Sequence, residues 1–275
     1  MILTDDVIRV APRAVQELDP YELMALLGKR YVHPGGRRAT EQLLAWADIG
    51  AGQQVLDIGC GSGTTAVRIA RSHGAQVTAA DISQLMLGLA RRAVDRAGVS
   101  GLVGVEWADI TALPYPDGAF DRVIAEAVTM FVRRRVAARE LVRVCRPGGR
   151  VLATEFFWRR PPTDEARRIF LGEVCPGLRF DSVQDWVEVY EDAGLSDVRT
   201  TVGPFEMLTV PGFLDDEGVR GMLAFAARSM SRKVYLRRLA WLMPRMARAV
   251  PYLGYIAVVG TRPAESGDGA GDPGR

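Results

Sequence analysis

The chain has 275 residues, of which 48% are hydrophobic and 25% charged, and its formal net charge is +2. These proportions are typical of a globular protein with one large core, and they exclude a disordered chain or one that binds nucleic acid through a large excess of positive charge. The first residues contain no apolar run of the length that a signal peptide needs, and the longest late uncharged run, residues 249–261, is shorter than the ~20 residues of a membrane-spanning helix. We therefore expect a cytoplasmic protein.

Cysteine and histidine are too few and too scattered for a metal centre. The three cysteines, Cys60, Cys145 and Cys175, form no CxxC pair, and only two histidines accompany them. Structural zinc sites and disulfide frameworks need paired or closely spaced ligands. The sequence therefore predicts neither a metal site nor a disulfide framework.

Residues 1–52 are predicted to form an N-terminal helical cap. Helical periodicity extends over residues 16–29 and 36–48, and the sequence RYVHPGG between them contains the turn formers Pro and Gly. We expect two helices joined by a short linker.

Residues 53–206 are predicted to form an α/β core. From Gln54 onward, short apolar runs rich in β-branched residues alternate with amphipathic helical runs, beginning with QVLDI and TTAVRIARS. This alternation is typical of a doubly wound, Rossmann-like and mostly parallel sheet with helices on both faces.

A helical insertion is predicted at residues 207–250, before a final strand of the core sheet at 251–263. Its Gly and Pro residues divide it into short helices, and its many Met and aromatic residues suit a bulky apolar ligand. We expect a mobile lid over the ligand site. The Gly-rich tail, residues 264–275, is predicted to be disordered.

The sequence VLDIGCGSG, residues 55–63, carries the clearest functional signal. It reads as a strand followed by a glycine-rich turn and a helix, which is where the free N–H groups of a parallel α/β sheet receive a ligand. The glycines are Gly59, Gly61 and Gly63, and position 64 is Thr, so the spacing departs from the GxGxxG of nicotinamide sites. A nicotinamide cofactor is therefore disfavoured.

This stretch resembles the first motif of the class I S-adenosylmethionine-dependent methyltransferases, in particular the small-molecule, type 11-like members. Three further segments resemble later motifs of that family in the same order: ADIS at residues 80–83 followed by Met86, WADITALPYPDGAFD at 107–121, and RPGGRVL at 146–152. The resemblance implies a methyltransferase fold and S-adenosylmethionine as the cofactor.

The resemblance also implies which residues would surround that cofactor. Around the methionine moiety it places Asp57, Gly59, Cys60, Gly61 and Gly63; around the ribose and adenine, Asp81, Ile82 and Met86; and at the adenine edge, Asp109 and Ile110. Alternative interpretations stay open for several of them. Asp81 and Asp109 fit turn or helix-capping residues, Met86 fits a core position, and Cys60 fits a small filler between glycines rather than a nucleophile.

Candidates for a general base are Glu126 after the fourth strand, Glu155 at the end of the fifth, and His33 in the linker before the second helix. Methyl transfer from a sulfonium requires alignment of the acceptor and, for oxygen or nitrogen acceptors, removal of a proton. Tyr31 and Glu126 are also candidates for cofactor contact, and His33 fits a residue that anchors its turn.

The insertion offers the best indication of the acceptor. From residue 218 to residue 263 the chain has nine basic residues and no acidic one. Such a stretch fits a solvated helix face, contact with a ligand or partner, or the surface of an anionic membrane, of which the membrane is not favoured. Nucleic acid is not expected, because the positive charge is local.

We therefore predict methyl transfer to the O, N or C atom of a small, hydrophobic metabolite in natural-product metabolism. The first alternative is a quinone, sterol or lipid methyltransferase at a membrane surface. The second is a methyltransferase fold repurposed for binding or for another reaction, because a fold alone does not determine function. The oligomeric state is left open.

Overall fold

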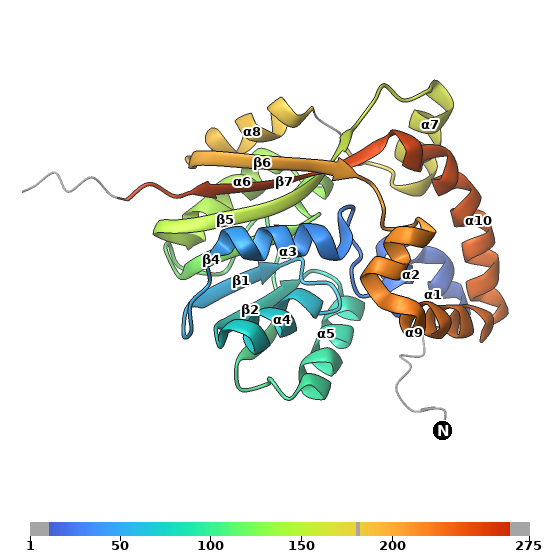
Figure 1. Cartoon of the computed structure of the whole chain (residues 1–275), viewed down its shortest axis with the longest axis horizontal. Coiled ribbons are helices and arrows are strands. Elements are labelled where there is room, and N and C mark those ends of the chain that lie inside the picture. Colours follow the sequence, from blue (N-terminus) through green and yellow to red (C-terminus); the bar gives the residue numbers. More distant parts are fainter. Residues whose placement is uncertain (1–10, 180–181, 265–275) are drawn as a thin grey trace, which may run out of the picture.

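The computed structural model describes residues 11–179 and 182–264, and it is built around one seven-stranded sheet (Figure 1). The strands are β1 (Gln54–Ile58), β2 (Gln76–Asp81), β3 (Val103–Trp107), β4 (Phe120–Glu126), β5 (Cys145–Trp158), β6 (Ser196–Pro204) and β7 (Leu253–Thr261). Their order across the sheet is β3-β2-β1-β4-β5-β7-β6. The first five run parallel and β7 runs antiparallel to both of its neighbours, which confirms the predicted α/β, mostly parallel fold.

Helices cover both faces of this sheet. The helices are α1 (Pro12–Glu17), α2 (Pro20–Leu26), α3 (Gly36–Ala47), α4 (Thr64–His73), α5 (Gln84–Ala97), α6 (Arg134–Val144), α7 (Asp164–Arg168), α8 (Val183–Glu191), α9 (Val210–Met230) and α10 (Lys233–Ala249), with short helical turns at Thr129–Phe131, Ile169–Val174 and Val250–Tyr252. On one face α3, α4 and α5 share a core with Val55, and on the other α6 and α8 share a core with Leu56. Adjacent strand residues therefore face two different cores, as period-two alternation requires.

The N-terminal cap contains one helix more than expected. Residues 16–29 were predicted to be one helix, but Pro20 begins a separate helix, α2, whose first turn Asp19 caps by accepting a hydrogen bond from the Glu22 N–H at 2.7 Å. Proline has no N–H to donate and is favoured in the first turn, so it starts a helix here instead of continuing one.

The insertion forms two helices, α9 and α10, instead of the several short ones predicted. Pro211 lies in the first turn of α9, where proline is tolerated, and Pro244 stays within α10. Only Gly218 has a non-helical backbone, with a φ of 67°, and it kinks α9. Figure 1 shows α1 and α2 beyond one end of the sheet, with α10 on their outer side and α9 beside them. None of the described helices is long and apolar enough to cross a membrane, and the predicted disorder of residues 265–275 concerns a segment outside the described residues.

Candidate active site

A cavity of about 320 Å³ lies at the carboxyl ends of β1, β2 and β4, under the N-terminal cap. Every residue that lines it lies between Asp19 and Val132. The predicted site residues that line it are Tyr31, His33, Asp57, Gly59, Cys60, Gly61, Asp81, Ile82, Met86, Asp109, Ile110 and Glu126. Two predicted residues, Gly63 and Glu155, are not part of the lining. The cavity is thus the place where most of the predicted site residues meet.

The glycine-rich loop after β1 forms the floor of the cavity because it folds back against β2. The N–H groups of Gly59 and Cys60 both donate to the carbonyl oxygen of Ala80, at 2.7 and 3.0 Å. Gly59 has a φ of 71°, and a Cβ there would lie 2.1 Å from a methyl carbon of Val128. Only glycine fits this position.

Gly63 has a different part in the same loop. It precedes α4 with a φ of 77°, and a Cβ there would lie 3.0 Å from the Cα of Ala90 on α5. The residue therefore allows α4 and α5 to pack closely, which explains why it is absent from the cavity lining.

Asp57, at the end of β1, is a buried carboxylate whose Oδ2 has no hydrogen-bond partner among the described residues. The residue is only 2% exposed, and burial raises its pKa well above the usual value, with the charges of Glu126 and Asp81 adding to the effect. A buried polar atom without a partner is unfavourable unless a ligand supplies one. The ammonium of an amino-acid moiety, as in S-adenosylmethionine, fits that requirement.

Asp81, at the end of β2, is both a turn residue and a cavity residue. Its Oδ2 accepts a hydrogen bond from the Gly61 N–H at 3.0 Å, and its Oδ1 accepts one from the Ser83 N–H at 2.8 Å. Burial raises its pKa, while these backbone hydrogen bonds act in the opposite direction. Because each carboxylate oxygen can accept more than one hydrogen bond, the fixed carboxylate can still accept from the hydroxyls of a ribose.

The wall of the cavity next to β3 and α5 combines apolar side chains with a turn that Asp109 stabilises. Asp109 accepts from both the N–H and the hydroxyl of Thr111, each at 2.8 Å, and thereby shapes the loop after β3. Met86 is buried at the start of α5, whereas Ile82 lies exposed at the cavity edge. This wall suits a flat, partly apolar group such as adenine.

Carboxylates outnumber basic groups around the cavity. Six acidic residues line it, against one arginine, Arg30, and one histidine, His33; the acids are Asp19, Glu22, Asp57, Asp81, Asp109 and Glu126. A cavity lined by one sign of charge concentrates ligands of the other sign. The arrangement fits a cationic cofactor that carries a sulfonium and an ammonium.

Glu126, at the end of β4, is held by threonines from two helices. Its Oε1 accepts a hydrogen bond from the hydroxyl of Thr65 on α4, and its Oε2 accepts one from the hydroxyl of Thr40 on α3, both at 2.7 Å. His33 Nε2 lies 3.2 Å from the same Oε2. The carboxylate is therefore fixed in orientation and lies beside an imidazole.

The hydrogen-bond network also assigns the protonated nitrogen of His33. Because the single hydroxyl hydrogen of Thr40 goes to Glu126, its oxygen accepts from His33 Nε2, which lies 3.0 Å away. In the neutral imidazole, the proton is thereby placed on Nε2, and Nδ1 carries the lone pair. That Nδ1 is buried and has no hydrogen-bond partner among the described residues.

Glu155 lies apart from this group. It is fully buried in β5, is not among the residues that line the cavity, and accepts a hydrogen bond from the Tyr190 hydroxyl at 3.0 Å. Burial, together with the charge of Glu155, raises the pKa of Tyr190 well above its usual value. The structure thus brings His33 and Glu126 together and leaves Glu155 in the core, where it supports α8.

Sequence reasoning missed Thr40, Thr65 and Glu22. The two threonines orient Glu126, and Glu22 of the cap accepts a hydrogen bond from the Ser83 hydroxyl at 2.5 Å, which fastens the cap to the start of α5. No local pattern marks these residues, since each partner lies 61 or more positions away in the chain.

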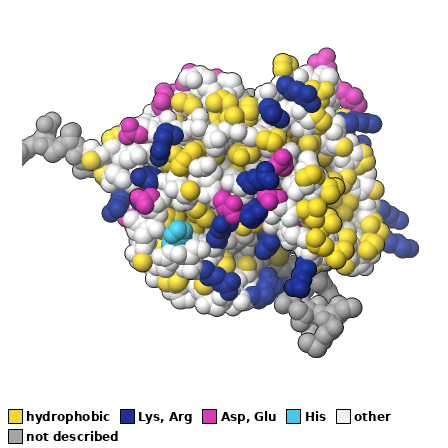
Figure 2. Space-filling model, in the orientation of Figure 1, with side chains coloured by type: hydrophobic (Ala, Val, Ile, Leu, Met, Phe, Trp, Pro, Cys, Tyr) yellow, Lys and Arg dark blue, Asp and Glu magenta, His cyan; other side chains and the backbone are white. Residues whose placement is uncertain are grey.

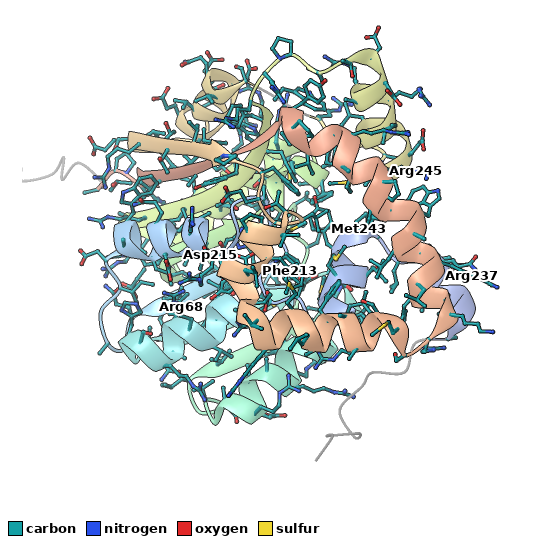
Figure 3. All side chains as sticks on the ribbon, turned by 45° about the vertical axis from the view of Figure 1, so that its right-hand side comes forward. Arg68, Phe213, Asp215, Arg237, Met243 and Arg245 are labelled. Atoms are coloured by element: carbon teal, nitrogen blue, oxygen red, sulfur yellow. The ribbon has the colours of Figure 1, made fainter. Side chains whose placement is uncertain are left out.

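The insertion holds the cap through three consecutive acids, Asp215, Asp216 and Glu217, called here the acid triplet. Figure 3 labels Asp215 of this triplet. The buried Lys29 donates to Asp216 Oδ2 at 2.7 Å, and Glu217 accepts from the Arg30 N–H at 2.7 Å. Further bonds join the triplet to the cap as follows: Arg30 Nε to Glu217 at 2.8 Å, the Arg37 N–H to Asp216 at 2.7 Å, and Arg37 Nη2 to Asp215 at 2.7 Å. The insertion contributes no lining residue but anchors the segment that carries Tyr31 and His33.

No metal centre is evident in the described part of the chain. It contains no group of three or more His, Cys, Asp or Glu side chains arranged to hold a metal ion. Burial raises the pKa of the Cys60 thiol well above its usual value. A thiol in that state is a poor nucleophile, so Cys60 acts in this loop as a small buried side chain.

Comparison with known proteins agrees with this geometry. A family model described as a methyltransferase domain matches residues 56–153. The chain is 34% identical over 198 residues to the methyltransferase GfsG of Streptomyces halstedii, covering 67% of this chain and 71% of the relative. It is 31% identical over 234 residues to the 27-O-demethylrifamycin SV methyltransferase of Amycolatopsis mediterranei, covering 82% and 83%.

A solved structure extends the comparison to the fold. An S-adenosylmethionine-dependent methyltransferase from Thiobacillus denitrificans, in complex with S-adenosylhomocysteine, superposes with a TM-score of 0.67 at 21% identity, covering 89% of this chain and all of that one. The cavity residues, the sequence relatives and the fold agree on one conclusion. The chain belongs to the class I S-adenosylmethionine-dependent methyltransferases.

Proposed function

We propose that the enzyme methylates a hydroxyl group of a small, hydrophobic secondary metabolite in the cytoplasm, with His33 as the general base. The observation that carries the proposal is the buried His33 at the cavity wall, whose Nε2 side is held by Thr40 and Glu126 while Nδ1 is without a partner. The relative from Amycolatopsis mediterranei supports an oxygen acceptor, since its name, 27-O-demethylrifamycin SV methyltransferase, describes methylation at an oxygen.

The cofactor and the chain divide the chemistry between them. When bound, S-adenosylmethionine supplies a methyl group on a positively charged sulfur. The sulfur leaves as a neutral thioether, so the oxygen of a hydroxyl group is a strong enough nucleophile to take the methyl group. The residues that would hold it are the glycine loop, Asp57 for the ammonium, and Asp81 for the ribose hydroxyls. Their contribution is alignment of the methyl group with the acceptor.

His33 accepts the proton, and Glu126 supports it. The Nδ1 lone pair takes the proton of the acceptor hydroxyl as the oxygen becomes nucleophilic, and the imidazole then carries a positive charge. Glu126 stabilises that charge, because its Oε2 lies 3.2 Å from Nε2. The hydrogen bonds from Thr40 and Thr65 hold the Glu126 side chain in this rotamer before the acceptor binds.

The test uses methyl-labelled S-adenosylmethionine with two panels of acceptors, one of hydroxylated polyketides and phenols and one of amines. We expect the label on an oxygen of a member of the first panel. The His33→Ala variant should transfer methyl groups roughly 10²- to 10⁴-fold more slowly while its affinity for S-adenosylhomocysteine stays within about threefold of the parent. A label found only on amines, or transfer by His33→Ala at the parent rate, would overturn the proposal.

A further inference from the structure

The two helices of the insertion carry an exposed apolar face that the active site does not use. Of the ten large hydrophobic side chains that are exposed in the described chain, six lie on α9 and α10, with exposed fractions from 37% to 67%; they are Val210, Val219, Leu223, Met230, Leu236 and Met243. Figure 2 shows hydrophobic side chains gathered over this part of the molecule. Exposed apolar side chains in such a concentration mark an interaction surface.

The apolar residues follow helical spacing. Val219, Leu223 and Met230 lie four and seven positions apart on α9, and Leu236 and Met243 lie seven apart on α10. Residues with these spacings lie on one side of a helix. We call these five residues the α9–α10 face.

Positive charge surrounds this face, without any negative charge of its own. Residues 218–249, which contain the face, include eight basic residues and no acidic one. Arg245 and Arg248 pair with Glu173 and Glu165, but Arg220, Lys233 and Arg237 make no ion pair within the described chain. Figure 3 shows Arg237 pointing away from the body of the protein.

We infer that the α9–α10 face binds the surface of an anionic lipid membrane. Amphipathic helices with Lys or Arg beside an apolar stripe lie in the interface of such membranes, where the apolar side chains enter the headgroup boundary and the cations attract the lipid phosphates. A second copy of the chain is a poorer match, because its own face would bring the same positive charges together.

The kink in α9 separates this face from the active-site half of the insertion. Gly218 follows directly after the acid triplet, and the face begins at Val219. The part of α9 before the kink is anchored to the cap through Lys29 and Arg30, whereas the part after it exposes Val219, Leu223 and Met230. Membrane contact through the face therefore leaves the cavity and its residues intact, and the inference does not depend on which acceptor atom is methylated.

Vesicle sedimentation of the full chain tests the inference. Vesicles of phosphatidylcholine with phosphatidylglycerol should bind the protein, binding should weaken as salt is raised, and vesicles of phosphatidylcholine alone should bind it far less. Each of Arg220→Gln, Lys233→Gln and Arg237→Gln should weaken binding roughly fivefold, and the three together roughly 100-fold. Leu223→Gln with Met230→Gln should weaken it at every salt concentration, since apolar burial is not screened.

Matched controls come from β6, which carries an exposed apolar residue and an exposed arginine outside the face. Val202→Gln and Arg199→Gln should leave vesicle binding unchanged. Absence of binding to anionic vesicles at low salt, or binding that the triple variant retains in full, would overturn the inference. So would self-association in sedimentation equilibrium, or binding to polyglutamate, without any binding to vesicles; these results would assign the face to a second copy or to an acidic protein.

Discussion

The two walls of the cavity are built in different ways. The cofactor wall consists of short stretches at the ends of neighbouring parallel strands, such as residues 57–61 and 81–83, and its geometry follows from local backbone requirements. The opposite wall belongs to the cap, and the cap is held by the insertion: Lys29 and its partner Asp216 are 187 positions apart. One wall is thus specified by a motif, and the other depends on charges that only folding brings together.

This difference predicts different responses to mutation. On the cofactor wall, removing a side chain should change binding of the cofactor while the fold persists. At the cap, removing one charge should change the stability of the fold itself, because its partner is then buried without compensation.

The largest expected effect concerns the buried pair of Lys29 and Asp216. Asp216→Ala removes the 2.7 Å hydrogen bond of the buried Lys29 ammonium and leaves it only Glu217, whose Oε1 lies 3.9 Å away. The substitution should lower the free energy of unfolding by about 3–5 kcal/mol. Lys29→Met combined with Asp216→Asn removes both charges but keeps an acceptor for the Arg37 N–H, so it should recover most of the loss. Urea unfolding measures both variants. A loss below about 1 kcal/mol for Asp216→Ala would show that water reaches the pair.

The second effect belongs to the cofactor wall. Asp81→Ala removes the acceptor of the ribose hydroxyls and should weaken binding of S-adenosylhomocysteine by ~2–3 kcal/mol, roughly 30- to 150-fold. Calorimetry gives the affinity, and Asp95→Ala, on the exposed side of α5, serves as the control with unchanged binding. A change of less than about threefold would leave Asp81 with its turn role alone.

A smaller effect is expected where the two walls meet. Thr40→Val keeps the volume of the side chain but removes the hydroxyl that joins His33 to Glu126. Methyl transfer should fall about tenfold, the equivalent of one hydrogen bond to a charged group, while affinity for S-adenosylhomocysteine is unchanged. Equal losses in transfer and in cofactor affinity would instead place Thr40 in the cofactor site.

The smallest expected effect is the release of protons when the cofactor binds. Burial raises the pKa of both Asp57 and Asp81, so in the free protein these carboxyls retain protons to a higher pH than exposed ones do. The cationic end of the cofactor favours the ionised form of Asp57, so binding in mildly acidic solution should release protons and tighten as pH rises. Calorimetry in two buffers of different ionisation enthalpy measures the release, which Asp57→Asn should reduce. Proton uptake on binding would contradict the assignment.

The same burial of Asp57 lowers the stability of the folded, cofactor-free protein at pH values above the ordinary pKa of an aspartate. A carboxyl whose pKa is higher in the folded than in the unfolded chain holds its proton more tightly when folded. Its contribution therefore disfavours the folded state as pH rises above the ordinary value of 3.8. Asp57→Asn should accordingly stabilise the cofactor-free protein near neutral pH, as measured by thermal unfolding.

The contrast between the walls also explains what the sequence could predict. The backbone of the loop after β1 has a positive φ at residues 59, 61 and 63 and therefore favours glycine there. The acid at the end of β2 accepts hydrogen bonds from the N–H groups of Gly61 and Ser83. Such requirements extend over a few residues, so a short sequence motif reveals them. The alternation of strands and helices likewise follows from local periodicity. The alternating strands and helices and the mostly parallel core were predictable on these grounds.

The cap and the insertion were less predictable for a physical reason. Nothing near Lys29 indicates that it is buried, and nothing near Thr40 indicates that it contacts Glu126, 86 positions away. The breaks in the insertion were predicted from Gly and Pro alone, yet Pro211 and Pro244 are accommodated and only Gly218 kinks the helix. The predicted lid over the acceptor stays a prediction, because the insertion reaches the cavity only through the cap.

Hydrogen–deuterium exchange with and without S-adenosylhomocysteine tests most directly whether the two walls enclose one cofactor site. A ligand held between them stabilises both, so amides of residues 57–65 and of residues 29–38 should exchange more slowly when it is bound, whereas amides of α8 and β6 should be unaffected. Protection of neither segment, or protection confined to elements outside the cavity, would contradict the assignment of this cavity as the S-adenosylmethionine site.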